Sequence, residues 1–242
     1  MTMVADKQLA NLVGQMKKAV GANLQSVILY GSAASGEFDP EYSNLNLLCI
    51  LRETAFSSLR ALAPAVEAWS RNARSAPLVI TWDELQRSAD VFSIELLDMK
   101  QNYRVLYGED LLQHLQVPMR LHRAQLEYEL REKLILLRER ILLSGGKRQR
   151  LQELLLRSVP SFLTLFRHAL LALGEPVPGN KSEVVERLSE KAGFDPAVFE
   201  QLLHVRKRKT GADSMQVEEV LGKYLAALER VVLTVDRLLD SA

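Results

Sequence analysis

The chain has 242 residues, of which 48% are hydrophobic and 25% are charged, and its formal net charge is +1. A chain of this length can bury one good core or two small ones, and a nearly neutral chain has no overall attraction to nucleic acid or to anionic membranes. We expect a soluble, cytoplasmic protein with no membrane partner, because no apolar run approaches a membrane span and the first residues lack the order of a secretory signal.

The first 115 residues alternate helical patterns with short β-rich runs. Apolar residues at helical spacing predict a first helix that ends at Gly21, and a similar pattern predicts a helix from Phe56 to Trp69. Thr81 and Glu84 have the spacing of a capping box, which predicts a short helix there. Four short apolar runs predict strands, at residues 26–30, 45–51, 76–81 and 103–107. The only cysteine, Cys49, falls inside the second run, so we interpret it as a buried apolar residue.

The chain after residue 115 is almost entirely helical in pattern. Leucines recur every three or four residues from Arg120, and Gly145-Gly146 should break this helix. Pro160 should kink the next helix or mark a boundary inside it. A Gly- and Pro-rich loop at residues 174–181 precedes three further predicted helices, at about residues 182–191, 196–205 and 215–239. The predicted fold class is therefore α+β, with a small mixed-sheet domain at residues 1–115 and an all-α helical bundle at residues 116–242.

Polar residues gather where the first two predicted strands meet. Gly31-Ser32 follows the first strand directly, where a glycine permits a sharp turn and a serine with free backbone amides can hold a phosphate. Asn44 and Asn46 open the second strand, and because they are two residues apart, their side chains point to the same face. Two carboxylates placed in this way would bind a pair of magnesium ions beside a nucleoside triphosphate.

This pattern resembles the signature of the nucleotidyltransferase superfamily related to DNA polymerase beta, which includes small bacterial members. The signature is Gly-Ser, a spacer, and an Asp-x-Asp pair that opens the next strand, commonly within Ser-Asp-x-Asp-Leu. Here it reads Gly31-Ser32, a spacer, and Ser43-Asn44-Leu45-Asn46-Leu47, so both aspartates are replaced. The resemblance covers roughly residues 5–110, and the helical remainder is similar in kind to the bundles of antibiotic-modifying bacterial nucleotidyltransferases.

The resemblance also implies a third carboxylate on a later strand, and the run at residues 76–81 carries none. Asp83 and Glu84 follow that run, in the predicted helix start. An asparagine is neutral and offers a metal ion one carbonyl oxygen, so two such replacements remove two negative charges from a magnesium site. Tight two-metal binding is then not expected. Since aspartate-to-asparagine is also the usual disabling substitution, the pattern fits either a natural loss, which we favour, or an engineered one.

We therefore predict a pseudoenzyme, with no catalytic residue, no metal ligand and no cofactor. The resemblance implies nucleotide binding at Gly31, Ser32 and Ser43, and a regulatory or antitoxin-like role. One alternative is an active nucleotidyltransferase that uses magnesium and a nucleoside triphosphate with altered metal ligands, for which Glu37, Asp39 and Glu41 in the intervening loop are candidates. Another is a protein-interaction module that pairs through its helical domain.

Two further features have less specific interpretations. The basic run Arg206 to Lys209 could contact a nucleic-acid backbone, but no aromatic residue is interleaved for base stacking, so we expect an exposed basic loop between helices. His122 and His168 lie in predicted helices next to arginines, and we interpret them as surface or boundary residues.

Overall fold

The computed structural model describes residues 3–34, 44–73, 75–208, 211 and 214–240. It divides into two compact units, Met1–Pro118 and Met119–Ala242. The division falls three residues after the boundary expected from the change in sequence pattern. Each unit has its own core and is described by itself.

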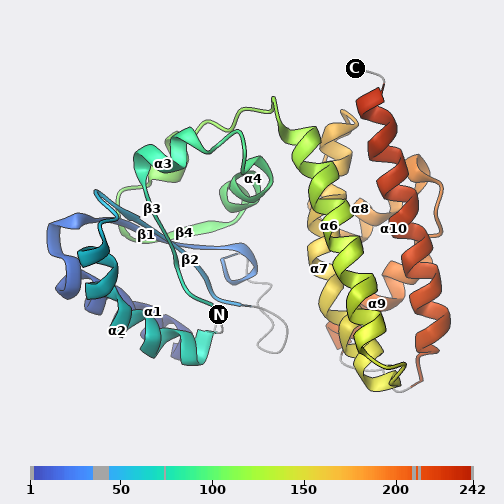
Figure 1. The fold of residues 1–242 in the computed structure, drawn as a ribbon, viewed down its shortest axis with the longest axis horizontal. Coiled ribbons are helices and arrows are strands. Elements are labelled where there is room, and N and C mark those ends of the chain that lie inside the picture. The colour runs from blue at the N-terminus through green and yellow to red at the C-terminus, as the bar shows by residue number, and fades with distance from the viewer. Residues whose placement is uncertain (1–2, 35–43, 74, 209–210, 212–213, 241–242) are drawn as a thin grey trace. The chain divides into compact units, whose positions relative to one another are not determined.

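The N-terminal unit is built on a mixed four-stranded sheet with the order β3-β2-β1-β4 (Figure 1). β1 is antiparallel to both β2 and β4, whereas β2 and β3 are parallel. Since parallel neighbours need a crossover, the chain between β2 and β3 forms the helix α2. The strands are β1 (Leu24–Tyr30), β2 (Asn46–Leu51), β3 (Leu78–Thr81) and β4 (Tyr103–Gly108).

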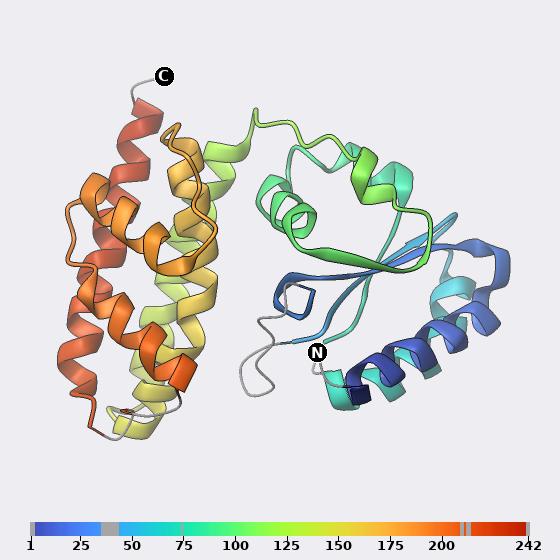
Figure 2. The same cartoon turned by 180° about the vertical axis from the view of Figure 1, so that it is seen from behind.

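Helices cover both faces of this sheet, as Figures 1 and 2 show. Alternate residues of β2 point to opposite sides, so Leu47 and Cys49 pack with α1 and α2, while Leu48 and Ile50 pack with α3 and α4. Cys49 is fully buried as predicted, and burial raises the pKa of its thiol to about 12. The helices of this unit are α1 (Met3–Val20), α2 (Phe56–Ala73), α3 (Trp82–Arg87), α4 (Ser93–Gln101) and α5 (Leu111–His114).

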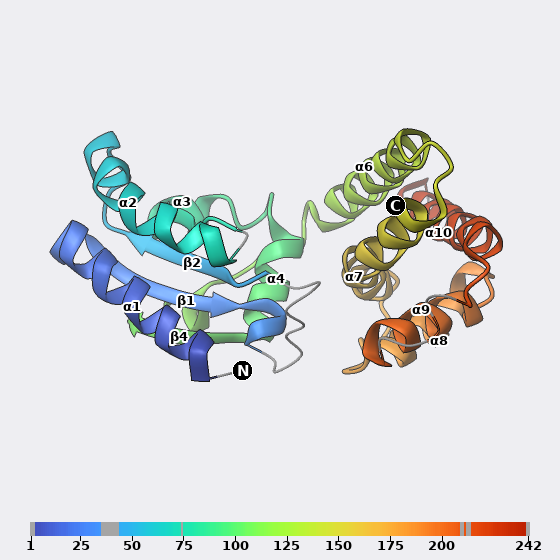
Figure 3. The same ribbon diagram turned by 90° about the horizontal axis from the view of Figure 1, so that it is seen from below.

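The C-terminal unit is a helical bundle. α10 packs against both α6 and α7, and α8 packs against α7; Figure 3 shows these helices from below. Phe166, Phe199 and Tyr224 bring three helices together at the centre, with ring centroids 4.9 Å and 5.1 Å apart. The helices are α6 (His122–Leu143), α7 (Arg148–Ala172), α8 (Lys181–Ala192), α9 (Ala197–Arg208) and α10 (Val217–Asp240). The predicted α+β fold class, a small mixed sheet followed by a helical bundle, is confirmed.

Several details differ from the sequence-based expectation. α7 continues through Pro160, so the alternative of a boundary there is wrong, and a kink stays a prediction. The basic residues Arg206, Lys207 and Arg208 belong to α9 and not to a loop, and Arg206 donates a hydrogen bond to the carbonyl oxygen of Leu156. Lys209 lies outside the described residues.

The prediction of surface or boundary positions for the two histidines is also wrong, because His122 and His168 are only 1% and 4% exposed. Their rings lie 5.0 Å apart between α6 and α7, so they are core residues of the bundle.

One described helix, α7, is long and apolar enough to cross a membrane, which the sequence analysis did not anticipate. Of its most apolar 18-residue window, 56% is buried inside the bundle. A core helix of a soluble protein passes the same test of length and composition, and α7 contributes to the bundle core in this way.

Candidate functional site

The Gly31-Ser32 turn begins where β1 ends. Gly31 has a φ of +78°, a left-handed conformation that glycine adopts without steric cost. Its amide nitrogen donates a hydrogen bond of 2.9 Å to the carbonyl oxygen of Asn102, and its own carbonyl accepts one of 2.9 Å from Ala34. Residues Gly31–Ala33 thus form one turn of 3-10 helix, fixed against the end of α4, and the side chain of Ser32 is half-buried there.

Asn46 lies beside this turn. It is the first residue of β2 and pairs with Tyr30 of β1, directly before Gly31. The side-chain nitrogen Nδ2 of Asn46 is 3.4 Å from the position that a Cβ atom on Gly31 would take. Asn46 is half-buried and Asn44 is exposed, whereas Leu45 between them is buried. The structure therefore brings Gly31 and Asn46 together, and Ser43 lies outside the described residues.

No carboxylate reaches this end of the sheet from β3, within the part of the chain that the structure describes. β3 consists of Leu78 to Thr81 and carries no acidic residue. Its last residue, Thr81, pairs with Leu51 of β2, which is five residues beyond Asn46. At about 3.3 Å per residue, Asp83 and Glu84 therefore follow β3 at the opposite end of the sheet, about 16 Å along β2 from Asn46.

Both of those acids also have structural partners. The carboxylate of Glu84 accepts hydrogen bonds from the backbone nitrogen (2.8 Å) and hydroxyl (2.9 Å) of Thr81, while the Thr81 hydroxyl accepts one from the Glu84 nitrogen. This confirms the predicted capping box, and these bonds lower the pKa of Glu84. Asp83 forms an ion pair of 2.8 Å with Arg87. Neither acid is therefore a substitute for a missing metal ligand beside Asn46.

Sequence analysis missed one acidic residue near the turn, Glu95 on α4. α4 packs against the Gly31–Ala33 turn. Burial, followed by the negative charge of Glu95, raises the pKa of the Tyr30 phenol, and Tyr30 is the last residue of β1. α4 had no clear sequence signal, because its first turn follows Phe92 and lacks a side-chain cap.

The residues at this site do not suit a magnesium ion. Among the described residues, no group of three or more histidine, cysteine, aspartate or glutamate side chains is placed to hold a metal. Asn46 supplies a neutral amide group where a hard dication prefers carboxylates, and Asn44, which precedes β2, is equally neutral. The candidate acids Glu37, Asp39 and Glu41 lie outside the described residues. The described residues at this site are a glycine turn with the Ser32 hydroxyl and the side-chain amide of Asn46, and these are neutral hydrogen-bonding groups.

Comparison with known proteins gives a structural match only. No family model and no curated protein sequence matches the chain. Among solved structures, the chain is similar to spectinomycin adenyltransferase AAD(9) from Enterococcus faecialis, determined with ATP and spectinomycin. The TM-score is 0.53 and the sequence identity is 16%, and the match covers 92% of this chain and 99% of that chain. The chain therefore has the nucleotidyltransferase fold that its Gly-Ser and Asn-Leu-Asn pattern indicates.

Proposed function

We propose that this protein binds a nucleotide at the Gly31-Ser32 turn and does not transfer nucleotidyl groups by two-metal catalysis. The observation that carries the proposal is which residues lie at the end of the sheet around Asn46. The turn is retained, the first residue of β2 beside it, Asn46, carries an amide, and the acids that follow β3 lie at the other end of the sheet. A fold neighbour was solved with ATP, which supports a nucleotide as the ligand class.

The physical reason is charge. A triphosphate is a polyanion, and magnesium ions held by carboxylates normally bring it to such a site and neutralise the developing charge. Without those carboxylates the site is also less repulsive to the triphosphate itself. Binding that depends on backbone amides, the Ser32 hydroxyl and asparagine side chains should therefore need no metal.

The test is calorimetric titration with ATP, GTP, CTP and UTP, each with and without magnesium. We expect the natural chain to bind at least one of them equally well in both conditions. The variant Asn44→Asp, Asn46→Asp should bind only with magnesium, because its two new carboxylates repel the triphosphate until a cation bridges them. A matched control, Asn11→Asp with Gln15→Glu, adds the same charge on exposed positions of α1 and should behave like the natural chain. Absence of nucleotide binding by the natural chain would refute the proposal.

An active enzyme with altered ligands is the second candidate, and Glu95 is the observation that favours it. Glu95 belongs to α4, which packs against the turn, and its negative charge contributes to the raised pKa of the Tyr30 phenol. If Glu95 served as an alternative acid in catalysis, the natural chain would release pyrophosphate from a triphosphate, and Glu95→Gln would abolish that release. We expect no release from either protein.

A regulatory or antitoxin-like partnership of the helical unit, and a cytoplasmic location, remain predictions. Tyr128, Ile135 and Leu142 are spaced by seven residues on α6 and are 63%, 53% and 81% exposed. Seven residues are two helical turns, so the three side chains lie on one face. The oligomeric state of the natural chain and of Ile135→Glu, measured by sedimentation, tests whether this face joins two copies.

A further inference from the structure

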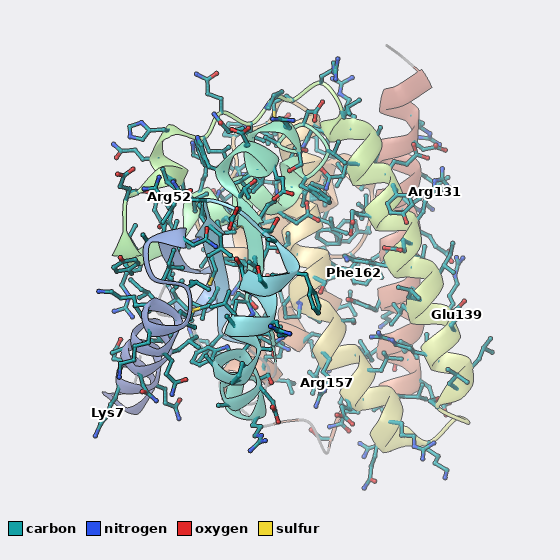
Figure 4. All side chains as sticks on the ribbon, turned by 60° about the vertical axis from the view of Figure 1, so that its left-hand side comes forward. Lys7, Arg52, Arg131, Glu139, Arg157 and Phe162 are labelled. Carbon is teal, nitrogen blue, oxygen red and sulfur yellow. The ribbon has the colours of Figure 1, made fainter. Side chains whose placement is uncertain are left out.

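A groove runs between α6 and α7 in the C-terminal unit. It encloses a cavity of about 250 Å³ that Leu136 of α6 and Phe162 of α7 help to line. Phe162 is buried and Leu136 is 40% exposed, so the groove has an apolar floor and one open apolar wall. Figure 4 labels Phe162 and Arg157 on α7. Ser161, which is exposed, adds a hydroxyl group at the rim.

The charged groups of this groove are all basic. Lys133, Arg140 and Arg157 line it, and no carboxylate belongs to the described residues that do so. Lys133 is paired with Glu129 at 2.9 Å, and Arg157 with Glu153 at 2.9 Å. The Arg140 guanidinium is exposed and has no carboxylate partner among the described residues. The rim therefore has an excess of positive charge, concentrated at Arg140.

Two arginines on another side of α6 are paired with carboxylates. On the side that faces α10, Arg131 bonds to Asp236 at 2.7 Å and Arg138 bonds to Glu229 at 2.7 Å. Where α6 faces α10, arginines of α6 thus pair with carboxylates of α10. Arg140 follows Lys133 by seven residues, so both side chains lie on the groove side, where none of the described lining residues is acidic.

We propose that the groove between α6 and α7 binds a small organic anion made of one apolar ring and one phosphate or carboxylate group. The apolar floor removes the ring from water, and an arginine guanidinium presents a fork of donors that matches either anion. Ligand pockets usually measure about 300–1,000 Å³, so this smaller cavity suits a single ring and not a whole nucleoside triphosphate. All described residues that line the groove belong to the C-terminal unit, whereas Gly31 and Ser32 belong to the N-terminal unit. The proposal does not depend on the proposed nucleotide binding.

The test is titration of the full chain with phenyl phosphate and with benzoate, followed by amide chemical shifts in ¹⁵N-labelled protein. Tryptophan fluorescence is a poor reporter, because Trp69 and Trp82 both lie in the N-terminal unit. We expect saturable shifts at the Ser161 amide and its neighbours with at least one of the two probes. Arg140→Gln should weaken this binding by about tenfold or more, because Arg140 is the basic lining residue for which no described carboxylate forms an ion pair.

Arg138→Gln is the matched control, since it removes the same charge from the same helix on the side facing α10. It should change the affinity by less than about twofold, because an exposed cation outside the groove adds little direct attraction. Ser161→Trp should compete with the ligand by filling the groove from an exposed position. Equal weakening by Arg138→Gln and Arg140→Gln would overturn the proposal. So would inorganic phosphate binding as tightly as phenyl phosphate, or the absence of saturation by both probes.

Discussion

Asn46 and Gly31 lie side by side, with the Asn46 side-chain nitrogen 3.4 Å from the position that a Cβ atom on Gly31 would take. The asparagine therefore packs over the turn that the glycine makes possible. The φ of +78° at Gly31 is a conformation that residues with a side chain rarely adopt. The conformation of Gly31 thus shapes the turn, and the side chain of Asn46 lies next to it.

We predict that Gly31→Ala lowers the free energy of unfolding by about 1–2 kcal/mol, mainly because a left-handed conformation strains any residue with a Cβ atom. The contact with Asn46 is at ordinary van der Waals distance and adds little. Gly14→Ala is the control, since Gly14 lies inside α1 with open space around it. That change should raise stability by about 0.5–1 kcal/mol. Urea unfolding measures the free energy of unfolding of both variants. If Gly31→Ala changed it in the same direction and by the same amount as Gly14→Ala, the turn would not be strained.

Gly108→Ala should be far more harmful than Gly31→Ala. Gly108 also has a φ of +78°, and a Cβ atom there would lie 1.8 Å from the carbonyl oxygen of Gln25. Backbone atoms cannot move aside as a flexible side chain can, so β1 and β4 would have to separate locally. We expect a loss of more than about 3 kcal/mol and a low soluble yield. A melting temperature within a few degrees of the natural chain would contradict this ranking.

The strands and the capping box were predictable because their signals are local. β1 and β2 are short apolar runs bounded by glycine or polar residues, and Thr81 and Glu84 have a fixed spacing in the chain. Glu95 was missed because α4 starts without a side-chain cap, so that its existence depends on packing against the sheet. The contact of α4 with the Gly31–Ala33 turn joins segments that are distant in sequence, and no periodicity in the sequence predicts such a contact.

Contacts between distant segments also explain why the surface or boundary positions predicted for His122 and His168 are wrong. Each histidine stands next to an arginine in sequence, which favours a surface position, yet each one faces the bundle core. The pairing requires α6 and α7 to meet in one particular register. Burial, followed by the charge of His168, lowers the pKa of His122 to about 4, from an ordinary value of about 6.5.

This shift predicts a loss of stability in acid. The folded state holds His122 neutral down to about pH 4, whereas the unfolded chain takes up a proton below about pH 6.5. The contribution of His122 is therefore fully present above pH 6.5 and is lost as the pH falls toward 4. At pH 4.5 we expect a loss on the order of 2 kcal/mol relative to pH 7, measured by urea unfolding at both values.

His122→Leu separates this effect from general acid denaturation. A leucine of similar size cannot titrate, so the stability difference between pH 7 and pH 4.5 should shrink by about the amount assigned to His122. His114→Leu is the control, because His114 is an exposed residue at the end of α5. If His122→Leu keeps the full pH dependence of the natural chain, other groups cause the acid sensitivity.

The hydrogen bond between Ser158 and Tyr224 predicts an asymmetry between two substitutions. The two oxygens are 3.0 Å apart, and the Ser158 hydroxyl is also 2.9 Å from the carbonyl oxygen of Leu155. With Ser158 donating to Leu155, the Tyr224 phenol donates to Ser158. Tyr224→Phe should then cost only about 0.5–1.5 kcal/mol, because Ser158 keeps its own acceptor.

Ser158→Ala should cost more, about 1–3 kcal/mol, because it leaves the hydroxyl group of the fully buried Tyr224 without its acceptor. Tyr224 is 0% exposed, and this burial raises the pKa of its phenol. The double variant should be less destabilised than the sum of the two single variants, since removing both partners leaves no unsatisfied group. Urea unfolding of all four proteins gives the coupling free energy, and strict additivity would mean that water replaces Ser158 as the acceptor.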